Sequence, residues 1–370
     1  MVVLPRFAAE ALALDAVFHA RLIRALVVRP DAALLAPSLL PFTSLFVAES
    51  HDRLRESLPG FRVEPVGVME LIRPARHRTK LLLSRKDHLT EMVAKYGSIA
   101  AQERKYFSTL HSGILAPLKR LVQPDLGLCT VAGHIFSTTH ATRFICGIET
   151  HNPRFVRSTS FVVSSYCAQL LATFAPNVKV LAFEPHKLAR VEQMDIKSVA
   201  LYRRGALGTV SEEWAAVLTM ILANLNFVRH VLSVLVPGDL PTMLKLRTLQ
   251  AFNAIHSIRR IQDRLRGDNQ LPSRAATVLA RAISSPEAKW LRTRHDLRDL
   301  LIHFRPRNIT PVHFEISYAD AIEVFGGATS AELAITASTI LRHLTETLTE
   351  GFNLDANSFW YGRLPRKGTG

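Results

Sequence analysis

Apolar residues recur at three- and four-residue spacing through the second half of the chain, and this spacing predicts amphipathic helices. Capping residues, glycines and prolines indicate where each helix begins and ends. The predicted helices cover 211–236, 241–266, 274–283, 285–304 and 330–350. Their connections are short except for 305–329, so we predict an antiparallel helical bundle over residues 209–352.

The first half of the chain has a less regular pattern. Residues 6–28, parts of 77–121 and the charge-poor stretch 158–178 are predicted to be helical, whereas 61–63 and 127–147 contain β-like patches. We therefore predict a mainly α fold with two domains. An α-rich N-terminal domain with some β (1–205) precedes the bundle, and a basic tail (353–370) follows it. Two glycines in 203–208 favour a boundary there.

The helix predicted at 285–304 carries polar residues on the side away from its core face. Ser285 is a good N-cap, Pro286 suits the first turn, and Pro306 should stop the helix near Phe304. The apolar stripe is expected to face the core, and consists of Trp290, Leu297, Leu301 and Phe304. The face away from it carries His295, Arg298, Asp299, Ile302 and His303. Ile302 stands among side chains that could bind a phosphate and transfer a proton. This pattern indicates a face that contacts a substrate or another subunit.

The amino-acid composition predicts a class of binding partner and a cellular location. The net charge of +15 and the isoelectric point near 10.2 point to polyanions, most simply nucleic acid. Three cysteines are too few and too odd in number for a disulfide framework, so we predict a cytoplasmic protein. The apolar run 32–48 is interrupted by prolines, which argues against a membrane span, and the charged residues near the start argue against a secretory signal.

Other kinds of site receive little support from the sequence. The cysteines and histidines between Cys129 and His151 fit no common zinc spacing. His295, Asp299 and His303 form a ladder on one helix that could hold a metal only with ligands from a facing helix, and none can be identified. We therefore predict no metal and no cofactor. No phosphate-binding glycine loop, nucleophile elbow or His-Glu-x-x-His motif is present.

The segment Arg298-Asp299-Leu300-Leu301-Ile302-His303, with the aromatic Phe304 after it, resembles the motif of the HEPN superfamily. The resemblance covers the C-terminal part of the chain only. It implies a helical bundle, commonly dimeric, and in many members a metal-independent endoribonuclease of toxin, phage-defence or RNA-processing systems. Arg298 would then hold the phosphate, His303 would act as base or acid, and Asp299 would orient the His303 ring. An antitoxin or another protein partner would also be expected.

Further residues follow from this resemblance and from the charge pattern. The arginines expected to contact RNA are Arg259, Arg260, Arg264 and Arg294. Arg298 and His303 point in different directions on one helix, which favours a site shared across a homodimer. Ile302 and His295 are expected at that dimer interface.

Two alternatives from different functional classes remain open. The first is the endoribonuclease. The second is a non-catalytic helical module that binds RNA or protein, in which His303 merely bonds to Asp299 at the helix end and Arg298 is solvated.

Overall fold

The first half of the chain folds into long helices, as its apolar periodicity predicts. The computed structural model describes residues 4–58, 60, 68–81, 86–109, 124–147, 153–180, 188–236 and 241–354. The helices of this half are α1 (Arg6–Val27), α2 (Ala32–Ser57), α3 (Val68–Leu81), α4 (Lys86–Thr109), α6 (Thr139–Cys146), α7 (Pro153–Phe174) and α8 (Ser198–Tyr202). The predicted helices at 6–28, within 77–121 and at 158–178 are confirmed. The β-like patch at 61–63 and most of the basic tail lie outside the described residues.

A small antiparallel sheet confirms the β pattern predicted within 127–147. Its strands are β1 (Leu126–Val131), β2 (His134–Thr138) and β3 (Val191–Ile196), in the order β2-β1-β3. Ala132 and Gly133 link β1 and β2 with φ of 47° and 81°. A two-residue hairpin turn of type I′ requires positive φ at both of its central residues, as found here. Leu128 pairs with Thr138 on β2 and with Met194 on β3.

The second half is helical, and most of its helices lie where the sequence predicts them. They are α9 (Glu212–Asn226), a π-helical stretch (Phe227–Leu232), α10 (Ser233–Leu235), α11 (Pro241–Gly267), α12 (Ser273–Ala282), α13 (Pro286–Arg292), α14 (His295–His303), α15 (Tyr318–Gly326) and α16 (Ser330–Phe352). Short 3-10 turns cover Leu207–Thr209 and Pro311–Phe314. The mainly α fold is thus confirmed, while the HEPN-type arrangement of the helices stays a prediction.

Two predictions for this half are wrong. The helix predicted at 285–304 is broken into α13 and α14 at Thr293 and Arg294. The Thr293 hydroxyl donates to the Trp290 carbonyl at 2.8 Å, a local bond that competes with the helical ladder. The long connection predicted at 305–329 contains α15, whose N-terminus is closed by a capping box between Ser317 and Asp320.

The prolines of the apolar run 32–48 do not interrupt it, contrary to prediction. Helix α2 continues through Pro37 and Pro41, because packing of its apolar side chains outweighs the two ladder hydrogen bonds that proline cannot make. By length and composition alone, Ala32–Ser57 and Glu212–Leu235 could each cross a membrane, and the bent pair α15–α16 could count as a third span. In the fold, 72% and 83% of the apolar windows of the first two are buried. The cytoplasmic location stays a prediction.

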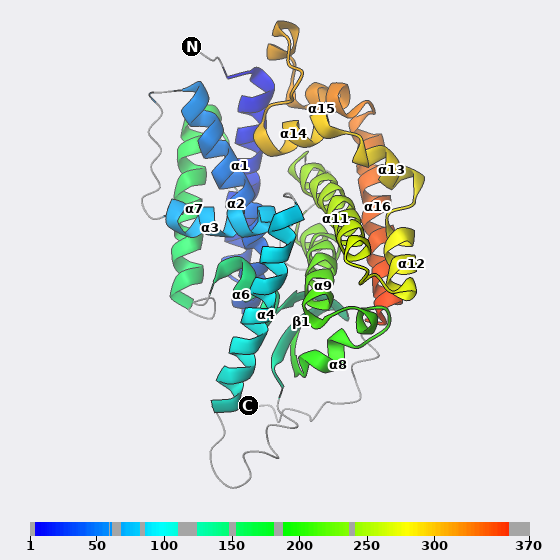
Figure 1. Ribbon diagram of the computed structural model, residues 1–370. Coiled ribbons are helices and arrows are strands. Elements are labelled where there is room, and N and C mark those ends of the chain that lie inside the picture. Colours follow the sequence, from blue (N-terminus) through cyan, green and yellow to red (C-terminus); the bar gives the residue numbers. More distant parts are fainter. Residues whose placement is uncertain are drawn as a thin grey trace.

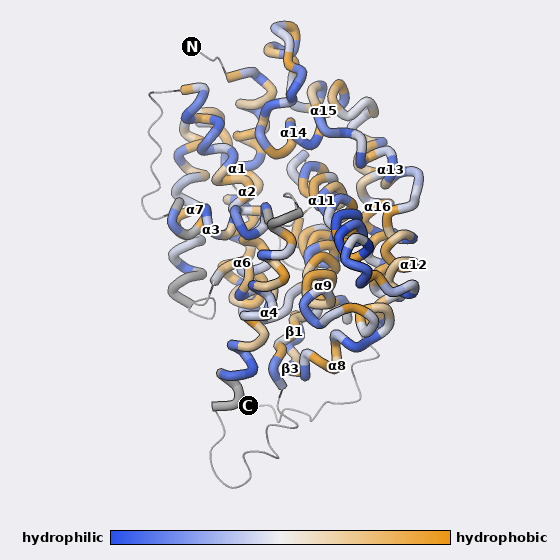
Figure 2. Tube along the Cα trace, in the orientation of Figure 1, coloured by the Kyte–Doolittle hydropathy of each residue, from blue (hydrophilic) through white to orange (hydrophobic). Residues whose placement is uncertain are grey.

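The helices of the two halves pack side by side around one core (Figure 1). In this view α1, α2 and α7 lie on one side, α11, α12 and α16 on the other, and α14 lies between them near one end. A single cluster of buried apolar side chains runs from Phe7 to Leu354. Figure 2 shows that α9 in the middle is largely hydrophobic. The segment at the predicted domain boundary is held against α16 by a 2.8 Å hydrogen bond from Ala206 N–H to the Gly351 carbonyl.

A buried ion pair also joins the two halves. Asp15 on α1 and Lys245 on α11 are 1% and 3% exposed, and their side chains meet at 2.5 Å. Thr242 donates a second hydrogen bond to Asp15 at 3.0 Å. The Lys245 ammonium lies 4.2 Å from the centre of the Phe304 ring, a distance at which a cation is attracted to the ring face. Phe304 directly follows His303, so this pair also supports the end of α14.

Candidate functional site

Helix α14 presents Arg298 near its middle and His303 as its last residue. The helix ends at Phe304, which takes the left-handed conformation with φ 52° and is 1% exposed. The burial of Phe304 fixes the direction in which the neighbouring His303 leaves the helix. His303 is 37% exposed and Arg298 is 21% exposed, so both side chains are partly accessible.

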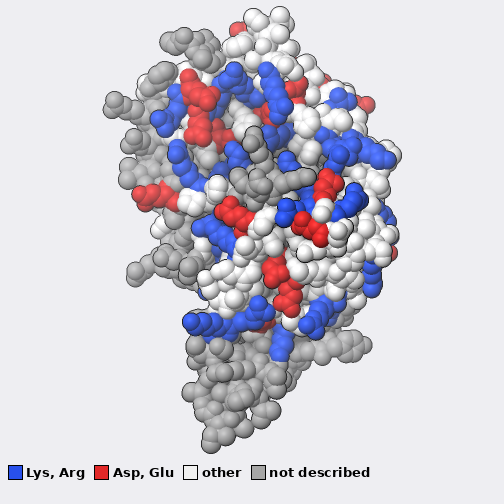
Figure 3. Space-filling view, in the orientation of Figure 1, with Lys and Arg blue, Asp and Glu red and all other residues white. Residues whose placement is uncertain are grey.

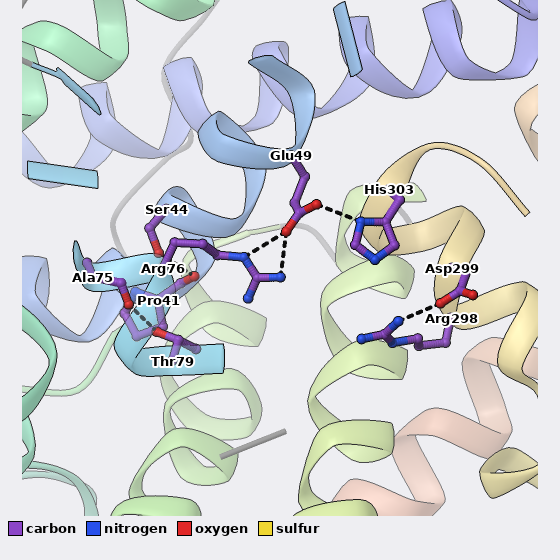
Figure 4. A network of polar contacts seen from close by, with 9 residues as sticks. All are labelled: Pro41, Ser44, Glu49, Ala75, Arg76, Thr79, Arg298, Asp299 and His303. Atoms are coloured by element: carbon purple, nitrogen blue, oxygen red, sulfur yellow. Dashed lines mark hydrogen bonds and ion pairs between the residues drawn. The ribbon is translucent and has the colours of Figure 1, made fainter. Parts of the chain in front are cut away.

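The partner of His303 is Glu49, which comes from α2 in the other half of the chain. His303 Nδ1 lies 2.6 Å from Glu49 Oε2. The other carboxylate oxygen of Glu49 accepts two hydrogen bonds from Arg76 on α3, at 2.9 and 2.6 Å. Figure 4 shows this arrangement, with the second ring nitrogen of His303 directed away from Glu49 on the side where the Arg298 guanidinium lies.

These contacts keep Glu49 ionised. Burial alone would raise the pKa of the Glu49 carboxyl, but the hydrogen bond with His303 and the charge of Arg76 outweigh burial and lower this pKa to about 2. An ionised carboxylate accepts hydrogen bonds and cannot donate one, so Nδ1 of His303 carries the hydrogen. The Nε2 of a neutral ring is then left as a proton acceptor.

Asp299 does not orient His303, so this sequence-based assignment is wrong. Its carboxylate, 8% exposed, accepts a 2.5 Å hydrogen bond from Arg298 and another from Arg307. Burial would raise the pKa of Asp299, and the hydrogen bonds from the two arginines lower it. Asp299 therefore holds the Arg298 side chain, and Glu49 takes the place beside the histidine.

Ile302 is buried inside the chain and is not an exposed interface residue. It is 1% exposed and lines a small cavity of about 50 Å³ together with Pro41, Phe42 and Leu45 of α2. Around Ile302 this face of α14 is covered by α2 of the N-terminal half, whereas Arg298 and His303 stay partly accessible. The prediction of a homodimer loses one of its two supporting observations and stays a prediction.

The other predicted interface residue, His295, is exposed at the start of α14. Its ring centre lies 5.9 Å from those of Phe252 and His256 on α11. Burial, together with the nearby charges of His295 and Arg260, lowers the pKa of His256 to about 4. His295 thus contacts α11 of its own chain.

Of the four arginines predicted to contact RNA, Arg260 lies beside Arg298. Burial lowers the pKa of the Arg260 guanidinium, and the charge of Arg298 adds to this effect. Arg259 and Arg264 pair with acids one turn along α11, at 4.0 and 2.8 Å. Arg294 lies over the Trp290 ring, 4.7 Å from its centre.

The basic charge of the chain is not gathered into one continuous patch on the face seen in Figure 3. There, Lys and Arg side chains are interspersed with Asp and Glu. At the site itself, Arg298 and Arg307 both bond to the carboxylate of Asp299, so two cations share one anion there.

Within the described part of the chain, no group of three or more His, Cys, Asp or Glu side chains is arranged to hold a metal ion. The side chains of His295, Asp299 and His303 do not converge on one point. Asp299 forms its hydrogen bonds with arginines, and His303 with Glu49. His151, from the cysteine- and histidine-rich segment, lies outside the described residues.

The chain matches no protein-family model, no curated protein and no solved structure. The resemblance of Arg298–His303 to the HEPN motif therefore rests on the residues themselves.

Sequence analysis missed Glu49 and Arg76 as members of the site. Glu49 is the first charged residue after the uncharged stretch 32–48, and a lone carboxylate at the end of such a stretch is a usable signal. Arg76 carries no such signal, because it stands among other basic residues such as Arg73 and Arg78.

The Glu49 contacts predict a specific dependence of stability on pH. A carboxyl whose pKa falls from 4.5 to about 2 on folding stabilises the protein above pH 4.5, and this contribution disappears as the pH falls toward 2. The upper bound is about 3 kcal/mol for such a shift. We expect the difference in unfolding free energy between wild type and Glu49→Gln to shrink from pH 5 to pH 2, measured by urea unfolding. A constant difference over this range would contradict the assigned role of Glu49, and Glu56→Gln, on the exposed side of α2, is the matched control.

Proposed function

We propose that this site cleaves RNA by proton transfer, without a catalytic metal ion. The observation that carries the proposal is the 2.6 Å contact between His303 Nδ1 and Glu49 Oε2 on a histidine that is 37% exposed. A carboxylate that fixes one ring nitrogen leaves the other available for a proton, which is the arrangement used in general acid–base catalysis.

The reaction uses the substrate's own hydroxyl as nucleophile. His303 Nε2 takes the proton of the ribose 2′-hydroxyl, and the 2′-oxygen attacks the adjacent phosphorus. The bond from phosphorus to the 5′-oxygen of the next nucleotide breaks, and that oxygen takes a proton from water. The products are a 2′,3′-cyclic phosphate and a 5′-hydroxyl end.

Arg298 supplies the fixed positive charge that this reaction needs. Its guanidinium is held by Asp299 at 2.5 Å and remains 21% exposed, so it has donors to offer to a phosphate oxygen. Arg260 adds a second charge nearby. Stabilisation of the developing charge on the phosphate by fixed donors is commonly the largest catalytic contribution.

Within this proposal Glu49 and Arg76 are positioning residues. Arg76 compensates the charge of Glu49, and Glu49 sets the ring orientation and tautomer of His303. Because α2 of the same chain supplies Glu49, the proton-transfer pair is complete in one subunit. Action in a toxin or phage-defence system, and an antitoxin partner, stay predictions.

The chemistry of the product ends tests the mechanism. We expect the purified protein to cleave single-stranded RNA in the presence of EDTA and to leave 2′,3′-cyclic phosphate ends, identified by mass spectrometry. An RNA with 2′-O-methyl groups should remain intact because its nucleophile is blocked. The matched control is the same RNA incubated with His303→Ala protein.

Two outcomes would contradict the proposal. Activity that EDTA removes and a divalent ion restores would indicate metal-assisted hydrolysis. Binding of RNA with no cleavage under any condition would favour the alternative, a non-catalytic binding module.

A further inference from the structure

Near the C-terminal end of α2, polar atoms of three side chains are buried and have no hydrogen-bond partner among the described residues. These side chains are His51, Arg53 and Ser57, and the atoms concerned are Nδ1 of the histidine, Nε and Nη1 of the arginine, and the serine hydroxyl. Arg53 is 4% exposed and Ser57 is 1% exposed. A buried donor without an acceptor is destabilising, and more so when it is charged, so such groups call for an occupant.

Arg53 and Ser57 continue a row that begins at Glu49. Successive members are four residues apart, so they lie on one face of α2, about one helical turn from each other. Glu49 meets His303 at the end of α14. The next position along the row, Arg53, is therefore close to the chain that leaves α14.

Arg305 follows His303 by two residues and is exposed. Its charge is close enough to Arg53 to add to the effect of burial, and both lower the pKa of the Arg53 guanidinium. Arg53 forms an ion pair with Glu56, whose carboxylate lies 3.7 Å from Nη1 and is 62% exposed. The charge of Glu56 raises the pKa of Arg53, against the effects of burial and Arg305. His51 is directed to Asp52, at 3.6 Å. Arg53 thus has one exposed acid for its charge, Arg305 adds a second positive charge near it, and the Ser57 hydroxyl one turn along α2 is unused.

We propose that Arg53, Ser57 and Arg305 form a binding site for a phosphate group, one helical turn along α2 from the Glu49–His303 pair. Guanidinium groups and a hydroxyl are the donors that bind phosphate oxygens best, and a phosphate would neutralise the two arginines. If the proposed function holds, the phosphate is that of the nucleotide next to the cleaved bond. The identity of the bound group as RNA rests on that function, whereas the site itself does not.

The first experiment asks whether the site binds phosphate. The melting temperature of the full-length protein is measured in sodium phosphate and in sodium chloride of equal ionic strength. We expect phosphate to raise it by roughly 2–4 °C near saturation. Arg305→Ala and Ser57→Ala should each remove this rise, and Arg55→Ala, an exposed arginine of α2, should keep it.

The Ser57→Ala variant also separates a binding role from a structural one. Its hydroxyl has no partner in the free protein among the described residues, so removing it should leave the melting temperature in chloride unchanged or slightly higher. A drop in chloride equal to the drop in phosphate would show that Ser57 is structural and would overturn the proposal. Equal melting temperatures of the wild type in the two salts would overturn it as well.

The second experiment identifies the source of the phosphate. A short fluorescein-labelled oligonucleotide with 2′-O-methyl groups, which the protein cannot cleave, is titrated by fluorescence anisotropy at several salt concentrations. We expect Arg305→Ala to weaken binding by roughly tenfold, the effect of one charge-assisted contact. The slope of log affinity against log salt should fall by about one. Arg55→Ala should change neither.

The two experiments distinguish failure of the site from failure of the proposed function. A phosphate effect that depends on Arg305 and Ser57, in a protein that does not cleave RNA, would retain the site and reject the ribonuclease. Cleavage that needs His303 but is indifferent to Arg305, with no phosphate effect, would reject the site and retain the ribonuclease. If the wild type binds free phosphate but Arg305→Ala leaves the affinity for the oligonucleotide unchanged, the proposal that the site binds a phosphate of RNA is overturned.

Discussion

Replacing His303 by alanine is expected to lower the rate of RNA cleavage by about 10²–10⁴-fold, the usual contribution of a general acid or base. The fold should survive this change. His303 is 37% exposed, and Glu49 keeps both hydrogen bonds from Arg76 when the ring is removed. Loss of the hydrogen bond to the Glu49 carboxylate should therefore cost about 1.5–3 kcal/mol, the usual range for a bond to a charged group. The measurements are initial rates on a fluorogenic RNA and urea unfolding curves.

His295→Ala is the matched control for this change. His295 lies at the other end of the same helix, is exposed, and contacts α11 rather than Glu49. Its replacement should leave the cleavage rate near that of the wild type. Full activity in His303→Ala, or equal losses in both variants, would remove His303 from the mechanism.

Replacing Lys245 by methionine is expected to destabilise the protein by about 3–5 kcal/mol, because it leaves the buried Asp15 carboxylate without its cation. Asp15 is 1% exposed and would retain only the hydrogen bond from Thr242. A loss of this size is a large fraction of the total stability of an ordinary domain. Urea unfolding followed by circular dichroism measures it.

Two companion variants sharpen this expectation. Glu350→Ala removes an ion pair with Arg281 whose side chains are 75% and 47% exposed, and it should cost less than about 1 kcal/mol. The double change Asp15→Leu with Lys245→Met removes both buried charges, so it should recover much of the stability lost in the single variant. If the Lys245→Met variant were as stable as the wild type, the ion pair between Asp15 and Lys245 would not contribute to the stability of the fold.

The long amphipathic helices could be predicted because the three- and four-residue spacing of their apolar side chains matches the face that each helix buries in the core. Helices α11 and α16 begin and end close to the predicted residues, whereas the helix predicted at 211–236 is divided into α9, a π-helical stretch and α10. The break between α13 and α14 could not be predicted, since neither glycine nor proline marks it; the Thr293 hydroxyl donates to the Trp290 carbonyl at this point, as threonines also do within unbroken helices. Helix α15 left a readable signal in Ser317 and Asp320, the capping box at its start, which was overlooked within a polar connection.

The candidate site could be predicted only in part. Arg298 and His303 were singled out because they lie five residues apart on one helix. Glu49 is 254 residues from His303 in the sequence, and no local pattern joins positions so far apart. Ile302 was misassigned because a helical wheel assumes one core face, whereas α14 is covered on more than one side, by α2 as well as by α11 and α15.

The continuous core has a consequence for how the protein is made. Glu49 leaves the ribosome long before His303, and the ion pair that supports Phe304 needs Asp15 from α1 and Lys245 from α11. Contacts between such distant positions form late, after a large loss of chain entropy. The contact between Glu49 and His303 therefore forms only after residue 303 has been synthesised. A nascent chain that has not yet reached residue 303 carries Glu49 without its histidine partner. The order of synthesis therefore determines when this contact can form beside ribosomal and messenger RNA.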